Sequence, residues 1–305
     1  MVKHSETVAE PVAADEFAEV PPPYSESRRI VQVFFGRKLA AIGFALVVAL
    51  VLTAIFAPWL APHNPYSIDI TQRLQHPSSE HLLGTDTLGR DTLSRVIYGT
   101  RISLLVGIGT VGLAAVIGMS LGLIAAYFGG ITFAIIMRLI DALMAIPMIL
   151  SALMVTAVLG GGLKNVIVAL SLGLIPIHCR LMSGQVLSIK QNYYVLAGRA
   201  MGGTDLRTML LHILPNAFPP LLVVMTIDLG MVILMEASLS FLGLGITPPT
   251  PAWGGMVSDG YLYLLTNPEL SLAPGFAIML TIFGFNMMGD GLRDAIDPRL
   301  RGAFN

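Results

Sequence analysis

Residues 102–126 read ISLLVGIGTVGLAAVIGMSLGLIAA, without a single charged side chain. A helix needs about 20 apolar residues to cross the hydrocarbon core of a bilayer, because its backbone polar groups must all be paired inside the segment. This run meets that requirement, and its glycines allow a neighbouring helix to approach closely. These glycines are Gly107, Gly109, Gly112, Gly118 and Gly122. The segment therefore predicts a transmembrane helix that packs against others.

Five further segments of the chain are apolar and long enough to cross a membrane. They lie within about residues 30–60, 137–159, 164–180, 217–244 and 272–290. Charged residues make up 12% of the chain, with a mean hydropathy of +0.75, whereas soluble domains carry about 25% charged residues. We therefore expect an all-α integral membrane fold with six transmembrane helices.

The fourth of these spans contains a proline. Pro176 removes one backbone donor and clashes with the preceding turn, so it predicts a kink. We expect the helix to continue beyond the kink into the polar segment that follows.

The remaining segments predict how the chain is divided. We expect a disordered tail over residues 1–29, an external segment with an amphipathic helix over 61–99, a transmembrane domain over 100–290 and a second tail over 291–305. Most of the 18 Lys and Arg residues fall on the side of the two termini and of the large loop 181–216. This bias predicts that both termini and the loop are cytoplasmic.

Composition also excludes some classes of function. The net charge of -1 and the lack of a Lys and Arg cluster argue against a nucleic-acid partner. The single cysteine, Cys179, has no partner for an internal disulfide. A phosphate-binding loop needs Gly, four residues, then Gly-Lys-Ser or Gly-Lys-Thr, and no such run occurs. Any ATP is therefore expected on another chain.

The internal loop carries the signals of a short helix with a sharp end. Gly202 and Gly203 provide that end. Thr204 or Asp205 can cap the helix that follows. Pro215 is expected to stop this second helix just before the fifth span.

Two strings of the loop resemble a known signature. Residues 194–202 read YVLAGRAMG and residues 212–216 read HILPN. They resemble the Glu-Ala-Ala, Gly and Leu-Pro signature that type I ABC importer permeases place on their cytoplasmic coupling helix. Leu196 and Gly198 occupy the Glu and second Ala positions of that signature.

Three more strings narrow the resemblance. They are GTDTLGRDTLSRVIYGTRISL at 84–104, SFLGLGITPPTPAWGGM at 240–256 and GDGLRDAIDPRLRG at 289–302. Together they are similar to the second permease of the dipeptide, oligopeptide and nickel uptake group. The similarity extends over about residues 30–302.

This resemblance implies a type I ABC importer permease fold in the plasma (inner) membrane. It implies a non-catalytic subunit forming half of a pathway for short peptides, with nickel or glutathione as alternative cargo. The expected partners are a sister permease in a heterodimer, one or two cytoplasmic ABC ATPase subunits that bind ATP and Mg, an extracytoplasmic substrate-binding protein and membrane lipid.

The same resemblance assigns a docking role to the loop. We expect residues 196–208 to dock into the separate ATPase subunit. The residues expected to couple to the ATPase are Leu196, Ala197, Gly198, Ala200, Met201, Gly202, Gly203, Asp205 and Pro215. An ordinary amphipathic loop on a non-transporting membrane scaffold is the alternative.

Two carboxylates interrupt the fifth span. Asp228 and Glu236 lie about two helical turns apart, so both point to nearly one side of the helix. Charges inside a membrane are costly and usually face a cavity or a partner. We expect this side to face the translocation pathway or the partner permease, with a structural contact between helices as the alternative. An ion-coupled secondary transporter would instead use these groups as coupling sites.

Other charged residues predict structural roles. Asp141 follows Arg138 at a spacing at which helix neighbours pair. Asp290, Arg293 and Asp294 are expected to mark the membrane interface at the end of the sixth span.

The external histidines suggest a metal site only weakly. His63, His76 and His81 have spacings that fit no compact ligand motif. We therefore expect solvated loop histidines and no metal site. In the same segment, Asp86 or Thr87 is the expected cap of the amphipathic helix.

Overall fold

The computed structural model describes residues 26–296. Residues 1–25 and 297–305 lie outside this range, and with them most of the two predicted tails. Within 26–296 every regular element is a helix, and β-structure is limited to an isolated bridge between Thr85 and Asp91. The helices are α1 (Glu26–Gly36), α2 (Lys38–Leu60), η2 (Ile70–Gln72), α3 (Thr92–Phe128), α4 (Gly130–Met144), α5 (Met148–Leu159), α6 (Leu163–Ile189), α7 (Tyr193–Ala200), α8 (Asp205–Arg207), the π-helix Thr208–Ile213, α9 (Leu214–Phe241), α10 (Trp253–Tyr261) and α11 (Glu269–Ile296).

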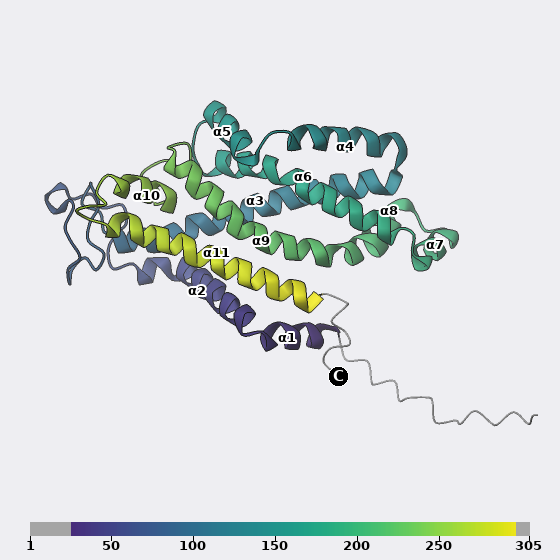
Figure 1. Cartoon of the computed structure of the whole chain (residues 1–305), viewed down its shortest axis with the longest axis horizontal. Helices are drawn as coiled ribbons and strands as arrows, with labels where there is room; N and C mark the ends of the chain where they lie inside the picture. The colour runs from purple at the N-terminus through teal and green to yellow at the C-terminus, as the bar shows by residue number, and fades with distance from the viewer. Residues whose placement is uncertain (1–25, 297–305) are drawn as a thin grey trace, which may run out of the picture.

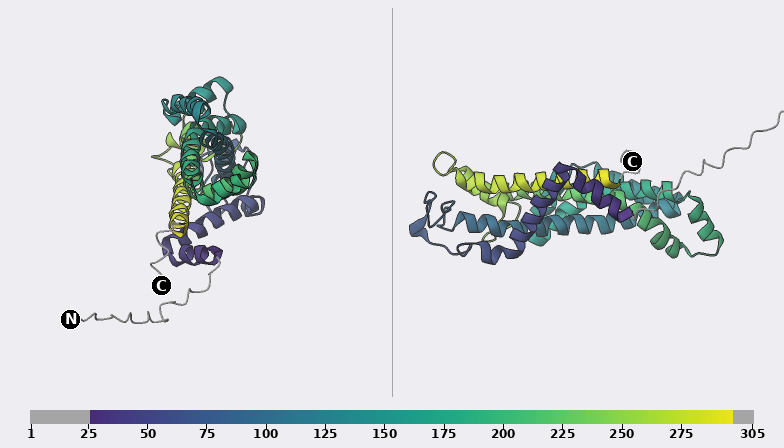
Figure 2. Two further views of the ribbon diagram at one scale, coloured as in Figure 1. Left: turned by 90° about the vertical axis from the view of Figure 1, so that its right-hand side faces the viewer. Right: turned by 90° about the horizontal axis from the view of Figure 1, so that it is seen from below.

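The long helices α2, α3, α6, α9 and α11 form one elongated bundle (Figure 1). The short helix α7 lies at one end of it and α10 at the other, and we refer to these as the α7 end and the α10 end. Figure 2 shows α1 on one flank of the bundle and α4 with α5 on the opposite flank.

Five helices are long and apolar enough to cross a membrane, and the α4–α5 pair makes a sixth if it is counted as one span. That pair differs from the single helix expected at 137–159, because α4 and α5 meet at an angle of 84°. Pro147 caps α5 in an extended conformation and disfavours a helical conformation for the residue before it. The bend therefore follows from Pro147, whose effect the apolar composition of the segment does not reveal.

Helix α3 is longer than the span expected at residues 102–126. α3 begins at Thr92, and the Asp91 carboxylate accepts from the Ser94 backbone N–H at 2.8 Å. The amphipathic helix expected outside the membrane is thus the first part of α3, and its cap is neither Asp86 nor Thr87. Asp86 instead accepts from the Arg90 side chain at 2.7 Å.

Helices α3 and α6 approach each other closely in the bundle. A Cβ atom on Gly118 would lie 2.7 Å from the Ile175 carbonyl oxygen, and one on Gly122 would meet the Cys179 carbonyl oxygen. These two glycines confirm the expected close approach, whereas Gly112 has open space around it. Only a residue without a side chain permits this backbone contact.

α6 runs from Leu163 through Pro176 to Ile189. The helix therefore takes up the beginning of the segment predicted as the internal loop. Lys190 follows α6 directly, and its Nζ donates to the Ala126 carbonyl oxygen near the end of α3 at 2.7 Å. Both helices are thus held together at the α7 end.

The α10 end is held by a tryptophan. Trp253 is fully buried, and its Nε1 donates to the Val96 carbonyl oxygen of α3 at 2.9 Å. Gly99 leaves the space in which the indole ring lies. A buried aromatic ring with its N–H satisfied fixes α10 firmly on the bundle.

Candidate functional site

The candidate site is the segment that joins α6 to α9 at the α7 end (Figure 1). It consists of α7, a turn at Met201–Gly203, and the short helix α8, which continues through the π-helix Thr208–Ile213 into α9. The expected docking residues all lie on this segment or in the first turn of α9.

Two glycines end α7 in a Schellman motif. The Gly202 N–H donates to the Arg199 carbonyl oxygen at 3.0 Å, and the Gly203 N–H donates to the Gly198 carbonyl oxygen at 3.1 Å. Gly202 adopts φ +86°, which side-chain-bearing residues rarely tolerate. The expected helix end at these glycines is therefore present, and its geometry explains the glycine at 202.

Of the two residues expected to cap the next helix, Thr204 does so. Its hydroxyl accepts from the Arg207 N–H at 3.4 Å, and its carbonyl oxygen accepts from the Thr208 N–H at 2.9 Å. The chain then stays helical into α9, in contrast to the stop expected at Pro215. Pro215 lies in the first turn of α9, directly after the π-helix Thr208–Ile213.

The loop is anchored by a compact apolar cluster. Val195 of α7, together with Met209 and Ile213 of the π-helix, is buried against residues of α3, α6 and α9. The cluster consists of Leu123, Ala126, Met182, Val186, Ile189, Val195, Met209, Ile213, Ala217 and Leu221. Through Val195, α7 is therefore packed on a core that three long helices share.

Polar contacts add to this anchoring. The Tyr127 hydroxyl at the end of α3 donates to the Asp205 carboxylate. The Arg199 guanidinium lies 5.7 Å from the centre of the Tyr127 ring, within the range of a cation–π contact. One tyrosine thus contacts both α7 and α8.

The outward side of the loop carries several exposed apolar side chains. Tyr193 is 90% exposed and Met201 84% exposed, and Leu196 and Leu206 are also exposed. A groove of about 360 Å³ lies beside them. It is lined by Tyr194, Gly198, Met201, Gly202, Gly203, Arg207 and His212. The nine expected docking residues are all exposed or half-buried.

The two carboxylates of α9 are buried within the chain. Asp228 faces His178 of α6, with 3.4 Å between Oδ2 and the histidine Nε2. Glu236 is fully buried and accepts a hydrogen bond from the Ser240 hydroxyl at 2.6 Å. The structure thus brings a histidine to Asp228 that the sequence reasoning did not single out.

Asp141 does not pair with Arg138 as expected. It lies on α4, and its carboxylate accepts from the Arg180 guanidinium of α6. Both side chains are about half exposed. At the end of α11, Asp294 forms an ion pair with Arg37, close to the junction of α1 and α2.

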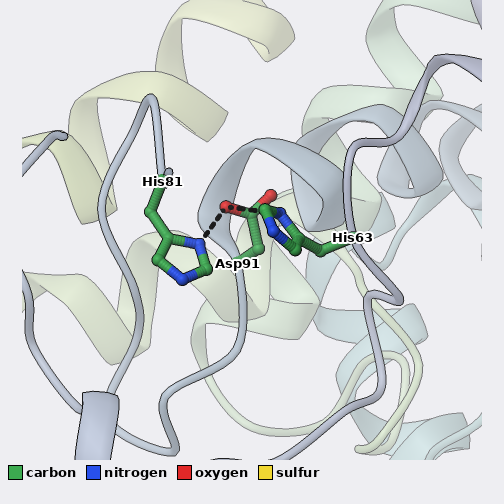
Figure 3. Close-up of side chains that lie close together, drawn as sticks. All are labelled: His63, His81 and Asp91. Carbon is green, nitrogen blue, oxygen red and sulfur yellow. Dashed lines mark hydrogen bonds and ion pairs between the residues drawn. The ribbon is translucent and has the colours of Figure 1, made fainter. Parts of the chain in front are cut away.

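The expectation of solvated external histidines is wrong for His81 (Figure 3). This residue is 4% exposed, and its Nδ1 lies 2.9 Å from Oδ1 of Asp91. His63 approaches the same oxygen from the other side, at 3.7 Å. Only His76 has a largely exposed side chain.

The sequence reasoning missed three residues that position these sites. His178 carried a usable signal, since it is a titratable side chain in an apolar span, like Asp228 and Glu236. Tyr127 and Val195 carried none, because their roles depend on which helices meet at the α7 end.

Comparisons with known proteins agree with this geometry. Residues 118–302 match the family described as the binding-protein-dependent transport system inner membrane component. Residues 25–77 match the N-terminal TM domain of oligopeptide transport permease C.

Several curated proteins are similar along most of their length. The chain is 42% identical over 264 residues to the dipeptide transport system permease protein DppC of Alkalihalophilus pseudofirmus, covering 87% of each chain. It is 41% identical to the probable D,D-dipeptide transport system permease protein DdpC of Escherichia coli, covering 90% of this chain and 92% of the relative. It is 42% identical to the glutathione transport system permease protein GsiD of Pectobacterium atrosepticum, covering 88% and 89%.

A solved structure shares the fold. A chain of the MetNI methionine ABC transporter in an inward-facing conformation is similar with a TM-score of 0.55 and 20% sequence identity. The similarity covers 67% of this chain and 97% of that chain. At this identity the likeness concerns the fold alone.

Proposed function

The chain belongs to the family of binding-protein-dependent transport system inner membrane components, and on this premise we propose that it is the permease subunit of an ATP-driven importer of short peptides. It contributes half of the translocation pathway, beside a sister permease in a heterodimer. The peptide cargo is supported by the similarity to dipeptide permeases. Glutathione, itself a short peptide, is the alternative that GsiD favours, and nickel remains an alternative from the family resemblance.

The observation that carries the proposal is the exposed apolar surface of the loop at the α7 end. Tyr193, Leu196, Met201 and Leu206 lie on short helices and turns outside the membrane-spanning helices α6 and α9. Exposed apolar side chains on such a segment favour a protein partner. We assign this partner as an ABC ATPase subunit that contacts the nine docking residues.

The mechanism follows from how the loop is held. Val195, Met209 and Ile213 pack into one core with α3, α6 and α9, so force applied to α7 moves these helices together. Packed interiors transmit displacement because they have few voids. ATP-driven approach of the ATPase subunits therefore switches the bundle between inward-open and outward-open forms.

The proposed orientation places the α7 end and both termini in the cytoplasm. It rests on the excess of Lys and Arg on that side. The α10 end then faces outward, where a substrate-binding protein delivers cargo. The localisation that fits these partners is the plasma (inner) membrane.

Catalysis is assigned to the partners. This chain serves as a non-catalytic subunit, while ATP and Mg bind to the ATPase subunits. The sequence contains no phosphate-binding loop of the Gly-Lys-Ser or Gly-Lys-Thr type.

For Asp228 and Glu236 two roles are proposed, one facing the translocation pathway or the partner permease and the other a structural contact between helices. Burial of Asp228 against His178 favours a structural contact over direct exposure to cargo. Asp228→Asn and Glu236→Gln test this point. Uptake that falls more than about tenfold, with assembly of the complex intact, favours a pathway role, and unchanged uptake favours the structural contact.

Site-directed crosslinking tests the docking surface. The one native cysteine, Cys179, is buried, so a single introduced thiol is the reactive one. Met201→Cys places a thiol at the α7 end, and Leu265→Cys places an equally exposed thiol in the loop after α10. We expect Met201→Cys to crosslink to the ATPase subunit in the assembled transporter and Leu265→Cys to leave it unmodified.

Two results would contradict this proposal. One is crosslinking of Leu265→Cys, but not Met201→Cys, to the ATPase. The other is uptake by the chain alone, driven by an ion gradient without ATP, which would establish a secondary transporter in place of an ABC permease.

A further inference from the structure

Three side chains that can bind metal ions converge at the α10 end (Figure 3). His63 lies in the loop after α2, His81 in the loop before α3, and Asp91 is the cap of α3. One ligand atom from each lies within 4.8 Å of the other two. Two imidazoles on either side of one carboxylate form a nitrogen and oxygen donor set that suits divalent transition metals such as Zn²⁺.

The two ring nitrogens of His81 face two different oxygen-bearing side chains, Gln72 and Asp91. Its Nε2 lies 3.2 Å from Oε1 of Gln72, an oxygen that only accepts. When Nε2 donates to that oxygen, a neutral imidazole leaves Nδ1 unprotonated and able to bind a cation. This Nδ1 lies 2.9 Å from Oδ1 of Asp91, so a histidine nitrogen and an anionic oxygen, both of which can bind a metal ion, meet there.

His63 completes the arrangement with a buried nitrogen. Its Nδ1 has no hydrogen-bond partner among the residues that the structure describes, although solvent does not reach it. The atom lies 3.7 Å from Asp91 Oδ1. Buried polar atoms without a partner are rare, and each requires an explanation such as an ion.

The distances agree with a tetrahedral centre. Zn²⁺ with bonds of about 2.0–2.1 Å places neighbouring ligand atoms about 3.3 Å apart. The separations of 2.9 Å and 3.7 Å from Asp91 Oδ1 lie on either side of that value. The third separation, between the two histidine nitrogens, is within 4.8 Å, so rotation of the rings is needed to bring all three atoms to bonding distance.

The ligands are also held in place by neighbours. The second carboxylate oxygen of Asp91 accepts from the Ser94 backbone N–H at 2.8 Å, and the Ser94 hydroxyl accepts from the His63 backbone N–H at 3.0 Å, which holds the loop that carries His63. Gln72 orients His81. Such outer contacts fix the orientation of metal ligands.

We propose that His63, His81 and Asp91 form a binding site for a divalent transition metal. Zn²⁺ is the ion used to test it. The ion joins the end of α2 to the start of α3 and so fixes the external segment between them. This role is independent of the cargo and of the ATPase partner.

Zn²⁺ binding to the full chain in lipid nanodiscs tests the proposal. The protein carries an affinity tag without histidines, is stripped with a chelator and is dialysed against buffered Zn²⁺. We expect about one bound Zn²⁺ per chain, and Co²⁺ at the same site is expected to show the absorption bands of a tetrahedral centre. Substituting Co²⁺ distinguishes a site of this geometry from loose surface binding.

The variants assign the ligands. The His63 ring makes no hydrogen bond within the described range 26–296, so His63→Gln removes one ligand without breaking such a bond. This variant is expected to abolish stoichiometric Zn²⁺ binding. Asp91→Asn keeps an oxygen that can cap α3 but removes the anionic ligand, with the same expected result. Gln72→Ala is expected to weaken Zn²⁺ affinity about 10- to 100-fold through the orientation of His81. His76→Gln, an exposed histidine of the same segment, is the matched control and should leave binding unchanged.

The proposal is overturned if the wild-type chain binds no stoichiometric Zn²⁺, because the cluster is then only a hydrogen-bonded His-Asp-His arrangement. It is equally overturned if His63→Gln binds as tightly as His76→Gln. Either failure leaves the permease function unaffected, since that is tested by crosslinking at the opposite end of the bundle.

Discussion

Gly202 offers the sharpest test of the docking loop, because its surroundings separate backbone from side-chain effects. A Cβ atom at this position would meet nothing within 4 Å, so a larger residue causes no clash inside the chain. The backbone at φ +86°, however, costs a residue with a side chain about 1–2 kcal/mol. For Gly202→Val the cost lies at the upper end, because β-branched residues are least tolerant of this region.

In the Gly202→Val variant, the loop is therefore expected to leave the conformation needed for docking while the ATPase subunit is not bound. A variant that abandons the turn loses the two hydrogen bonds of the Schellman motif and must regain the geometry on docking. At 1.4 kcal/mol per factor of ten, a cost of about 1–2 kcal/mol weakens the affinity for the ATPase subunit about 5- to 30-fold. Gly202→Asn is expected to lose less, because Asn adopts this conformation more readily.

The assay is the dissociation constant of the ATPase subunit from the permease pair in nanodiscs, measured together with peptide uptake by the reconstituted transporter. Gly112→Ala is the matched control, since Gly112 lies in helix α3 with open space around it and is expected to leave affinity unchanged. The reasoning is refuted if Gly202→Val keeps wild-type affinity and uptake. It is also refuted if Gly202→Asn weakens the affinity as much as Gly202→Val does.

Three further predictions concern the supporting structure. Gly122→Leu forces a side chain against the Cys179 carbonyl oxygen and should destabilise the bundle by about 1–3 kcal/mol, seen as a lower thermal midpoint in detergent. Trp253→Phe keeps an aromatic side chain but replaces the indole by a smaller ring and loses the hydrogen bond to Val96, so a loss of at least about 1 kcal/mol is expected in the same assay. Burial raises the pKa of Asp259 at the α10 end, so its ionisation costs the folded state more than the unfolded state. Asp259→Asn should therefore stabilise the protein near neutral pH and lose this advantage as pH falls through the raised pKa towards the ordinary pKa of Asp, and an advantage that grows at low pH would contradict this sign.

The membrane-spanning helices could largely be predicted from sequence, because apolar length is a local property. The uncharged run of α3 and its glycines at 118 and 122 indicated a packed span, and the structure pairs both glycines with α6. The Gly202-Gly203 helix end was predictable for the same reason, since a Schellman motif is formed by a few consecutive residues.

Features that depend on distant contacts were not predictable. The bend between α4 and α5 lies at Pro147, but a proline alone does not distinguish a kink of 84° from a mild one. The pairing of Asp141 with Arg180 required the α4–α6 contact, which no local spacing reveals.

The external histidines illustrate the same limit. Their spacing along the chain matches no compact ligand motif, and this led to the expectation of solvated side chains. Folding of the loop between α2 and α3 nevertheless brings His63 and His81 to one carboxylate. A site assembled from three separate segments leaves no short sequence motif.

The most direct test of the central claim is peptide uptake by proteoliposomes that contain this chain and its sister permease, with and without the ATPase subunit. The binding protein and ATP are supplied on their respective sides. The account predicts uptake only when the ATPase and ATP are both present, and its loss when the loop at Tyr193–Gly203 can no longer dock. Uptake of equal rate without the ATPase would contradict it.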